Sequence, residues 1–206
     1  SGVRLEAHTH IVMGSMPRLE ALEACCQRAK ISVIDLVFAP LAQAESLLTP
    51  QAREMGVALV DIGSDTTDLS VFEGGQLVHS AMIGIGGEHV TLDVKDCLNT
   101  PAVEAEHLKQ VHGCAVADMI RADETISVPG VGGRRARSIK RRYLCEIIEA
   151  RMEEIIRLVG EELNQIGYTG GFPGGLVMTG GTANIAGLCE LAEQVLGIPA
   201  AKSAPK

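Results

Sequence analysis

Carboxylate and hydroxyl side chains follow a short apolar run in the first third of the chain. Val57 to Val60 suit a buried strand, Asp61 ends it, and Gly63 to Asp68 read Gly-Ser-Asp-Thr-Thr-Asp. A tight turn of small residues can hold backbone N–H groups toward a phosphate, and an adjacent carboxylate can hold magnesium. The same residues also fit an ordinary hairpin with a polar turn, and this stretch alone leaves both interpretations open.

Two pairs of glycines stand at other corners of the chain. Gly86-Gly87 precedes a predicted helix over 88–98, and Gly180-Gly181 follows the apolar run Leu176 to Met178. Glycine lets the backbone approach a ligand because no Cβ stands in the way. The amides at the start of the 88–98 helix are expected to be free for an anion. Such corners are also common connectors, so they indicate a ligand site only together with other motifs.

Two groups of charged residues are candidates for binding. Glu106 and Lys109 lie three residues apart on one face of a predicted helix over 101–112, a spacing that usually gives a solvated ion pair. Six of the nine residues from Arg134 to Arg142 are basic. Such a run is usually a solvated face, but in an acidic protein it also fits a docking patch for an acidic partner.

Composition excludes several classes of protein. The net charge of −8 over 206 residues argues against a general nucleic-acid binder. The six cysteines include no Cys-x-x-Cys pair, which predicts reduced thiols in a cytosolic protein. No apolar run approaches the roughly 18 residues needed to span a bilayer, and no signal peptide is recognised. With 46% hydrophobic residues and 23 glycines, the chain suits an α/β fold with many turns.

The periodicity of the apolar residues predicts the elements that must position these motifs. Strands are expected at 3–13, 31–38, 57–60, 69–72, 76–84, 124–128 and 176–178. Helices are expected at 17–30, 41–48, 88–98, 101–112, 139–165 and 184–196. The tail over 200–206 is expected to be disordered.

Three of these motifs, in this order, resemble the second half of the actin-like ATPase superfamily. They are Asp61 to Asp68, the helical pair Glu106 and Lys109, and Met178 to Thr182. That superfamily includes sugar kinases, heat-shock chaperone ATPases, MreB and FtsA. In it the first motif is the second phosphate loop, the Glu/Lys pair closes over the adenine, and the last motif is the adenosine loop.

The detailed resemblance is to the FtsA family of bacterial cell-division proteins, from about residue 3 to 199. It is carried by Phe38 to Ala42, Gly56 to Gly63, Val111 to Ala115, Val128 to Gly133 with Arg137-Ser138, and Gly175 to Gly181. The segments around His112 to Cys114 and Val131 to Gly133 separate FtsA from the rest of the superfamily.

The resemblance implies an incomplete actin-like ATPase (ribonuclease H-like) α/β fold, with a mixed sheet flanked by helices and a small inserted α+β subdomain. Residues 1–56 would be the C-terminal remnant of the first actin-like domain, with 1–14 the end of its FtsA-specific inserted subdomain. Residues 57–85 and 149–199 would form subdomain 2A with both nucleotide loops. Residues 86–148 would form subdomain 2B, which binds partners.

The implied cofactors are ATP and Mg²⁺, with Asp61 holding the magnesium through water. The expected nucleotide contacts are Gly63, Ser64, Asp65, Thr66 and Thr67 for the phosphates, Gly86 and Gly87 lining the cleft, Glu106 and Lys109 for the nucleoside, and Gly180, Gly181 and Thr182 for the adenosine. The family usually has glycines where this chain has Ser64 and Asp65. A carboxylate beside the γ-phosphate should repel it, which predicts weaker nucleotide binding or turnover.

The implied function is a cell-division scaffold that binds ATP, polymerises, recruits later division proteins and links the division ring to the cytoplasmic face of the inner membrane. Its first partner would be the acidic C-terminal tail of the tubulin-like FtsZ, contacted by Arg137 and Arg151. Nucleic acid is not expected as a partner. The alternatives are a small-molecule kinase of the same fold and a pilus-assembly homologue of the PilM type.

Compared with that family, the chain is expected to be a fragment. The first phosphate loop would precede Ser1. The last strand and helix of the fold, and the amphipathic helix that reaches the membrane, would follow Lys206. At most a weak ATPase is expected. The 206 residues alone should bind ATP poorly, because half of the phosphate cradle would be missing.

Overall fold

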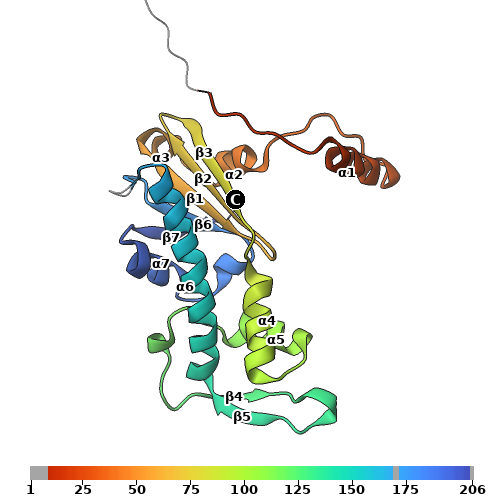
Figure 1. The fold of residues 1–206 in the computed structure, drawn as a ribbon, viewed down its shortest axis with the longest axis vertical. Helices are drawn as coiled ribbons and strands as arrows, with labels where there is room; N and C mark the ends of the chain where they lie inside the picture. The colour runs from red at the N-terminus through yellow and green to blue at the C-terminus, as the bar shows by residue number, and fades with distance from the viewer. Residues whose placement is uncertain (1–8, 169–171, 205–206) are drawn as a thin grey trace, which may run out of the picture.

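The computed structural model describes residues 9–168 and 172–204, and in them a five-stranded mixed sheet carries the fold (Figure 1). The strands are β1 (Val57–Ile62), β2 (Thr67–Glu73), β3 (Gln76–Ile83), β6 (Leu176–Thr179) and β7 (Ala200–Lys202), in the order β3-β2-β1-β6-β7. β1 pairs antiparallel with β2 and parallel with β6, and β7 continues the parallel half. The predicted mixed sheet is confirmed.

Helices cover both faces of the central strand β1. On one face, Ala58, Val60 and Ile62 join the main core with the long helix α6 (Arg141–Gln165). On the other, Val57 and Leu59 pack with residues of α2 (Ala39–Leu47) and its flank. A strand buried on both faces reads as a continuous apolar run, which is why Val57 to Val60 were recognisable in the sequence.

A smaller helical part lies beyond one end of the sheet (Figure 1). It contains α4 (Gly87–Leu98), α5 (Ala102–His112) and the antiparallel pair β4 (Thr125–Val128) and β5 (Arg137–Lys140). It also contains the short 3-10 helices η1 (Ala117–Met119) and η2 (Val131–Gly133), whereas a further one, η3 (Thr182–Asn184), follows β6 at the sheet. α6 runs from this part up to the sheet, and its apolar side is buried in both.

The remaining helices are α1 (Met16–Arg28), α3 (Pro50–Met55) and α7 (Leu188–Leu196). α1 stands away from the sheet and has no buried residue (Figure 1). Among the described residues, no helix is both long enough and apolar enough to cross a membrane.

Most predicted elements are confirmed, with shifted ends, and four predictions are wrong. Residues 9–13 and 31–38 are not strands, because no neighbouring strand pairs with them in the described part of the chain. Residues 3–8 lie outside it. The helix expected at 184–196 begins only at Leu188, after η3. Residues 200–202 are ordered as β7, since β6 offers an unpaired edge for them, while 205–206 lie outside the described residues.

Candidate functional site

Two turns that lie far apart in the sequence meet at one edge of the sheet. β1 and β6 are parallel neighbours with Val60 opposite Met178 and Asp61 opposite Thr179, so both strands end at the same edge. The 63–67 turn and the 180–182 turn follow them there. The Thr182 hydroxyl donates a hydrogen bond to the Gly63 carbonyl over 2.9 Å. The two predicted turns are therefore in direct contact.

The 63–67 turn offers backbone amides as hydrogen-bond donors to a ligand. The Gly63 amide donates to the Thr66 carbonyl over 2.9 Å and closes the turn. Within residues 9–168 and 172–204, no hydrogen bond uses the amides of Ser64, Asp65 or Thr66. Successive free amides are what a phosphate group requires. Ser64 and Asp65 are not among the described residues with positive φ, so this turn does not need glycine at those positions.

Other members of the predicted site have structural partners instead. The Thr67 hydroxyl donates to the Ile85 carbonyl over 2.8 Å, and the residue is fully buried. The amides of Gly87 and Glu88 donate to the carbonyls of Gly63 and Ser64 over 2.9 and 2.8 Å. The expectation that the first amides of α4 are free for an anion is therefore wrong for these two, because the 63–67 turn satisfies them.

The glycines before α4 permit this close packing. A Cβ on Gly86 would lie 2.5 Å from the Ser64 carbonyl oxygen, and a Cβ on Gly87 would lie 2.2 Å from the Thr182 hydroxyl. Gly86 and Gly87 thus serve to bring the start of α4 against both turns.

Glu106 and Lys109 of α5 are more than a solvated pair. The Lys109 ammonium lies 2.6 Å from Glu106 Oε2 and donates to the Gly87 carbonyl over 2.9 Å and to the Thr91 hydroxyl over 2.8 Å. Its side chain is only 8% exposed. All three N–H donors of the Lys109 ammonium therefore have acceptors. Through these hydrogen bonds, Lys109 connects α5 to the start of α4.

The surroundings of Glu106 favour its charged form. Burial alone would raise the pKa of this carboxyl, but hydrogen bonds from Lys109, Thr91 and Gln110 outweigh that effect and lower the pKa below 4.5. The ionised carboxylate therefore stabilises the folded state above the unfolded pKa, and this contribution is lost as the pH falls through the folded pKa.

We expect Glu106→Gln to destabilise the protein at pH 7. The effect should shrink as the pH falls below about 4.5 and through the lower pKa of folded Glu106, because the wild-type side chain then becomes neutral like the glutamine. Urea unfolding of both chains between pH 7 and pH 3 measures the difference. A difference in unfolding free energy that stays constant over this range would contradict the assignment.

Asp61 and Asp68 form an acidic pair across the β1–β2 ladder. Burial raises the pKa of Asp68, the Thr66 hydroxyl opposes this by hydrogen bonding, and the Asp61 charge adds to the rise. The described residues contain no cluster of three or more His, Cys, Asp or Glu side chains suited to a metal. Magnesium is commonly held by one or two carboxylates with water and phosphate oxygens as the other ligands, so this pair fits that ion.

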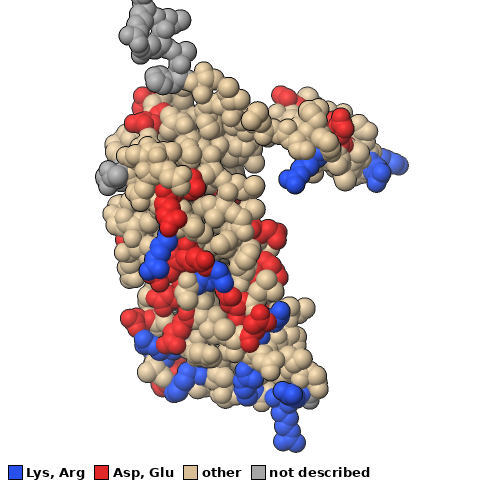
Figure 2. All heavy atoms as spheres, in the orientation of Figure 1, with Lys and Arg blue, Asp and Glu red and all other residues tan. Residues whose placement is uncertain are grey.

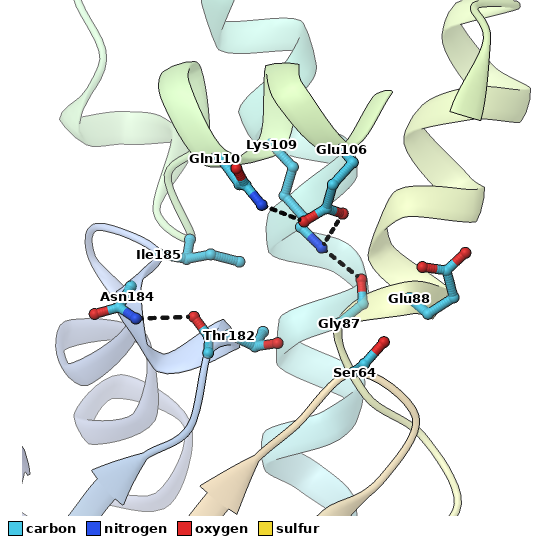
Figure 3. Close-up of a pocket in the computed structure, with 10 residues that line it drawn as sticks. Ser64, Gly87, Glu88, Glu106, Lys109, Gln110, Thr182, Asn184 and Ile185 are labelled. Atoms are coloured by element: carbon cyan, nitrogen blue, oxygen red, sulfur yellow. Dashed lines mark hydrogen bonds and ion pairs between the residues drawn. The ribbon is translucent and has the colours of Figure 1, made fainter. Parts of the chain in front are cut away.

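These elements enclose a cavity of about 370 Å³ (Figure 3). Its lining residues are Ser64, Gly87, Glu88, Glu106, Lys109, Gln110, Gly181, Thr182, Asn184 and Ile185. Each of the three predicted motifs therefore contributes to this lining, the first of them through Ser64 alone, and Asp61 and Gly180 line a neighbouring cavity instead. The contact of each residue with a nucleotide stays a prediction. Sequence reasoning missed four lining residues, Glu88, Gln110, Asn184 and Ile185. Only Gln110 carried a signal, since it follows Glu106 by one helical turn and bonds to it.

The two arginines expected to bind a partner lie in different surroundings. Arg151 of α6 donates to Asp93 of α4 over 2.6 and 3.1 Å and also pairs with Glu154. It lines a groove of about 470 Å³ between α4 and α6, with Asp93, Cys97, Glu146, Ile147, Ala150 and Glu154. Arg137 lies outside that lining and donates to the Leu98 carbonyl.

The surface charge also differs between the surroundings of Arg151 and those of Arg137. In Figure 2, Asp and Glu side chains gather over the middle of the molecule, and several Lys and Arg side chains lie at the end formed by β4 and β5. The groove that Arg151 lines is therefore surrounded mainly by acidic groups, whereas the basic run from Arg134 to Arg142 belongs to the far end.

Comparison with known proteins identifies what this arrangement is similar to. Residues 58–206 match the family model described as cell division protein FtsA. FtsA of Pseudomonas aeruginosa is 42% identical over 205 residues, which are 100% of this chain and 49% of that protein. FtsA of Escherichia coli is 39% identical over 95% of this chain and 48% of its own length. The chain spans about half the length of the curated relatives it matches.

Solved structures confirm the fold. MreB5 of Spiroplasma citri bound to ADP superposes with a TM-score of 0.74 at 19% identity, covering 93% of this chain and 61% of its own. The PilM–PilN pilus complex gives a TM-score of 0.67 at 16% identity, covering 89% of this chain and 46% of its own. The predicted actin-like ATPase fold is correct, as a partial domain.

Proposed function

Because the chain belongs to the FtsA family of cell-division proteins, we propose that it forms the nucleotide-binding second half of an ATP-binding division scaffold. The observation that carries the proposal is the single cavity faced by the 63–67 turn, the 180–182 turn and the Glu106–Lys109 pair. The fold neighbour from Spiroplasma citri holds ADP, which supports the same class of ligand here.

The geometry suggests how each wall would act on ATP. The nucleoside would lie against Ile185 and the Glu106–Lys109 pair, and the phosphates would accept from the free amides of the 63–67 turn. Bound magnesium would supply positive charge to the phosphates, with Asp61 holding it. The Asp65 carboxylate would repel the terminal phosphate, so we expect at most weak ATP hydrolysis.

Filling the cavity tests this function. We expect Ile185→Trp, in the complete natural protein that carries residues 1–206, to weaken ATP binding at least about tenfold, because the indole occupies space that the nucleoside needs. Val103→Trp is the matched control, since Val103 is 80% exposed on α5 and does not line the cavity. Isothermal titration with ATP measures both. Equal affinity in the two variants would refute this location for the nucleotide.

We also propose that the C-terminal tail of FtsZ binds the α4–α6 groove. Ile147 and Ala150 give the groove lining an apolar part, and the guanidinium of Arg151 can pair with a tail carboxylate. Such a carboxylate must compete with Asp93, which already holds Arg151. Arg137 would contact the tail from outside the groove, where the basic run gives a favourable field.

The groove predicts opposite effects for the two partners of one ion pair. Arg151→Gln should weaken the binding of an FtsZ tail peptide by about tenfold, since a charge-assisted hydrogen bond is lost. Asp93→Asn should strengthen it or leave it unchanged, because Arg151 is then free of its competitor. Fluorescence anisotropy of a labelled peptide measures both, and Arg137→Gln tests the second arginine separately. Loss of binding in Asp93→Asn with unchanged binding in Arg151→Gln would refute the roles of Arg151 as the group that binds the tail and of Asp93 as its competitor.

The rest of the proposal is supported by family membership alone. It comprises self-association into filaments, recruitment of later division proteins, and attachment of the division ring to the cytoplasmic face of the inner membrane in the complete protein. A fluorescent fusion of the complete protein should localise to the division site, and an even distribution in dividing cells would count against these parts.

A further inference from the structure

A side chain from outside the predicted motifs reaches the carboxylate of Asp61. Gln43 lies on α2, and its amide Nε2 donates to Asp61 Oδ2 over 2.5 Å. Both residues are half-buried. α2 packs on the opposite face of the sheet from α6 through Ala44, so this bond connects the far face of the sheet to the edge where the two turns meet.

Asp61 is held from its other side as well. A Cβ at position 180 would lie 2.3 Å from Asp61 Oδ1, which places this oxygen against the Gly180 backbone. The carboxylate therefore lies between α2 and the 180–182 turn, with its two oxygens in different surroundings. Asp68 lies opposite on β2. The Gln43 amide therefore fixes one Asp61 oxygen and the Gly180 backbone confines the other.

The Asp61 carboxylate also faces a second cavity, of about 370 Å³, next to the first. Gln43, Asp61, Thr179 and Lys202 line it, and Gly181 and Asn184 belong to the linings of both cavities. A cation at Asp61 would thus lie beside the phosphate end of the first cavity and in reach of α2.

We propose that Gln43 is a positioning residue that orients Asp61 for a divalent cation and makes α2 part of the cation site. The proposal rests on the function above, in which Asp61 holds the magnesium that accompanies ATP. A partner that hydrogen-bonds a metal-binding carboxylate fixes its rotamer, and loss of such a partner typically costs about 10- to 100-fold in metal affinity. Gln43 adds no ligand of its own and acts through Asp61.

The test separates cation affinity from nucleotide affinity. In the complete natural protein, Gln43→Ala removes the donor and suits the alanine-rich α2, and Gln43→Met removes it while keeping the length of the side chain. Gln51→Ala and Gln51→Met are the matched controls, since Gln51 is exposed on α3. Binding of a fluorescent ATP analogue is measured first in EDTA and then over a Mg²⁺ titration, and urea unfolding is followed in parallel.

Both Gln43 variants should shift the Mg²⁺ midpoint upward by about tenfold or more, with analogue affinity in EDTA and the unfolding midpoint unchanged. The Gln51 variants should match the wild type. A Mg²⁺ midpoint that is the same in Gln43→Ala, Gln43→Met and the wild type would overturn the role of Gln43 and leave nucleotide binding intact. A wild type that binds no analogue at any Mg²⁺ concentration would overturn the proposed function itself.

Discussion

Replacing Gly180 by alanine is expected to destabilise the protein by about 3 kcal/mol and to abolish nucleotide binding. Gly180 has φ +93°, a conformation that side chains with a Cβ rarely adopt. Its Cβ would lie 2.3 Å from Asp61 Oδ1 and 2.4 Å from the Ile62 carbonyl oxygen. Backbone strain and steric overlap therefore add, and relieving them must separate the two turns that form the cavity.

The neighbouring glycine provides a matched control. Gly181 has φ −60° and ψ −40°, and a Cβ there would meet nothing within 4 Å. Gly181→Ala should therefore leave the unfolding free energy unchanged or raise it by about 0.5 kcal/mol, because alanine restricts the unfolded chain. Urea unfolding of both variants measures the contrast. Equal destabilisation by the two substitutions would show that the close contact at Gly180 does not exist.

The second large effect is expected at Lys109. Lys109→Met keeps the aliphatic stem but removes the ammonium, which takes one donor from the Gly87 carbonyl and the only ion-pair partner described for it from the Glu106 carboxylate. Breaking a buried pair in this way costs about 3 to 5 kcal/mol. Glu106 is 37% exposed and can recover water, so we expect the lower end, about 3 kcal/mol, together with loss of nucleotide binding.

A surface lysine and a double variant serve as controls. Lys95→Met removes an exposed pair with Asp96 and should change the unfolding free energy by less than about 0.5 kcal/mol. Lys109→Met combined with Glu106→Gln should be less destabilising than the sum of the two single substitutions, since the double variant leaves no uncompensated charge. Urea unfolding of the wild type, Lys109→Met, Glu106→Gln and the double variant gives the coupling free energy between the two side chains. Strict additivity would contradict the ion pair.

The positions of the two turns and of the Glu106–Lys109 pair could be predicted because each depends on local sequence. An apolar run such as Val57 to Val60 indicates a buried strand, a glycine corner marks its end, and the i, i+3 spacing puts two charges on one helical face. That these pieces meet came from the resemblance, since nothing in the spacing alone indicates that β1 and β6 are neighbours.

Contacts that depend on tertiary packing could not be predicted. The Gln43–Asp61 bond joins residues 18 apart in sequence, and only the crossing of α2 behind the sheet brings them together. Residues Ala200 to Lys202 show no strand pattern of their own, and they pair because β6 presents a free edge. The amides of Gly87 and Glu88 look available from sequence and are satisfied only by the folded 63–67 turn.

The continuity of α6 has a mechanical consequence for the cleft. Its 25 residues form one uninterrupted helix of about 38 Å, which packs against the sheet and against the smaller helical part that contains α4 and α5. Because α6 is continuous and packed along its length, α4 and α5 cannot move away from the sheet without disrupting the packing of buried residues such as Ile148 and Ile155. The width of the cleft is thus preset, and a ligand entering it meets walls that need little reorganisation.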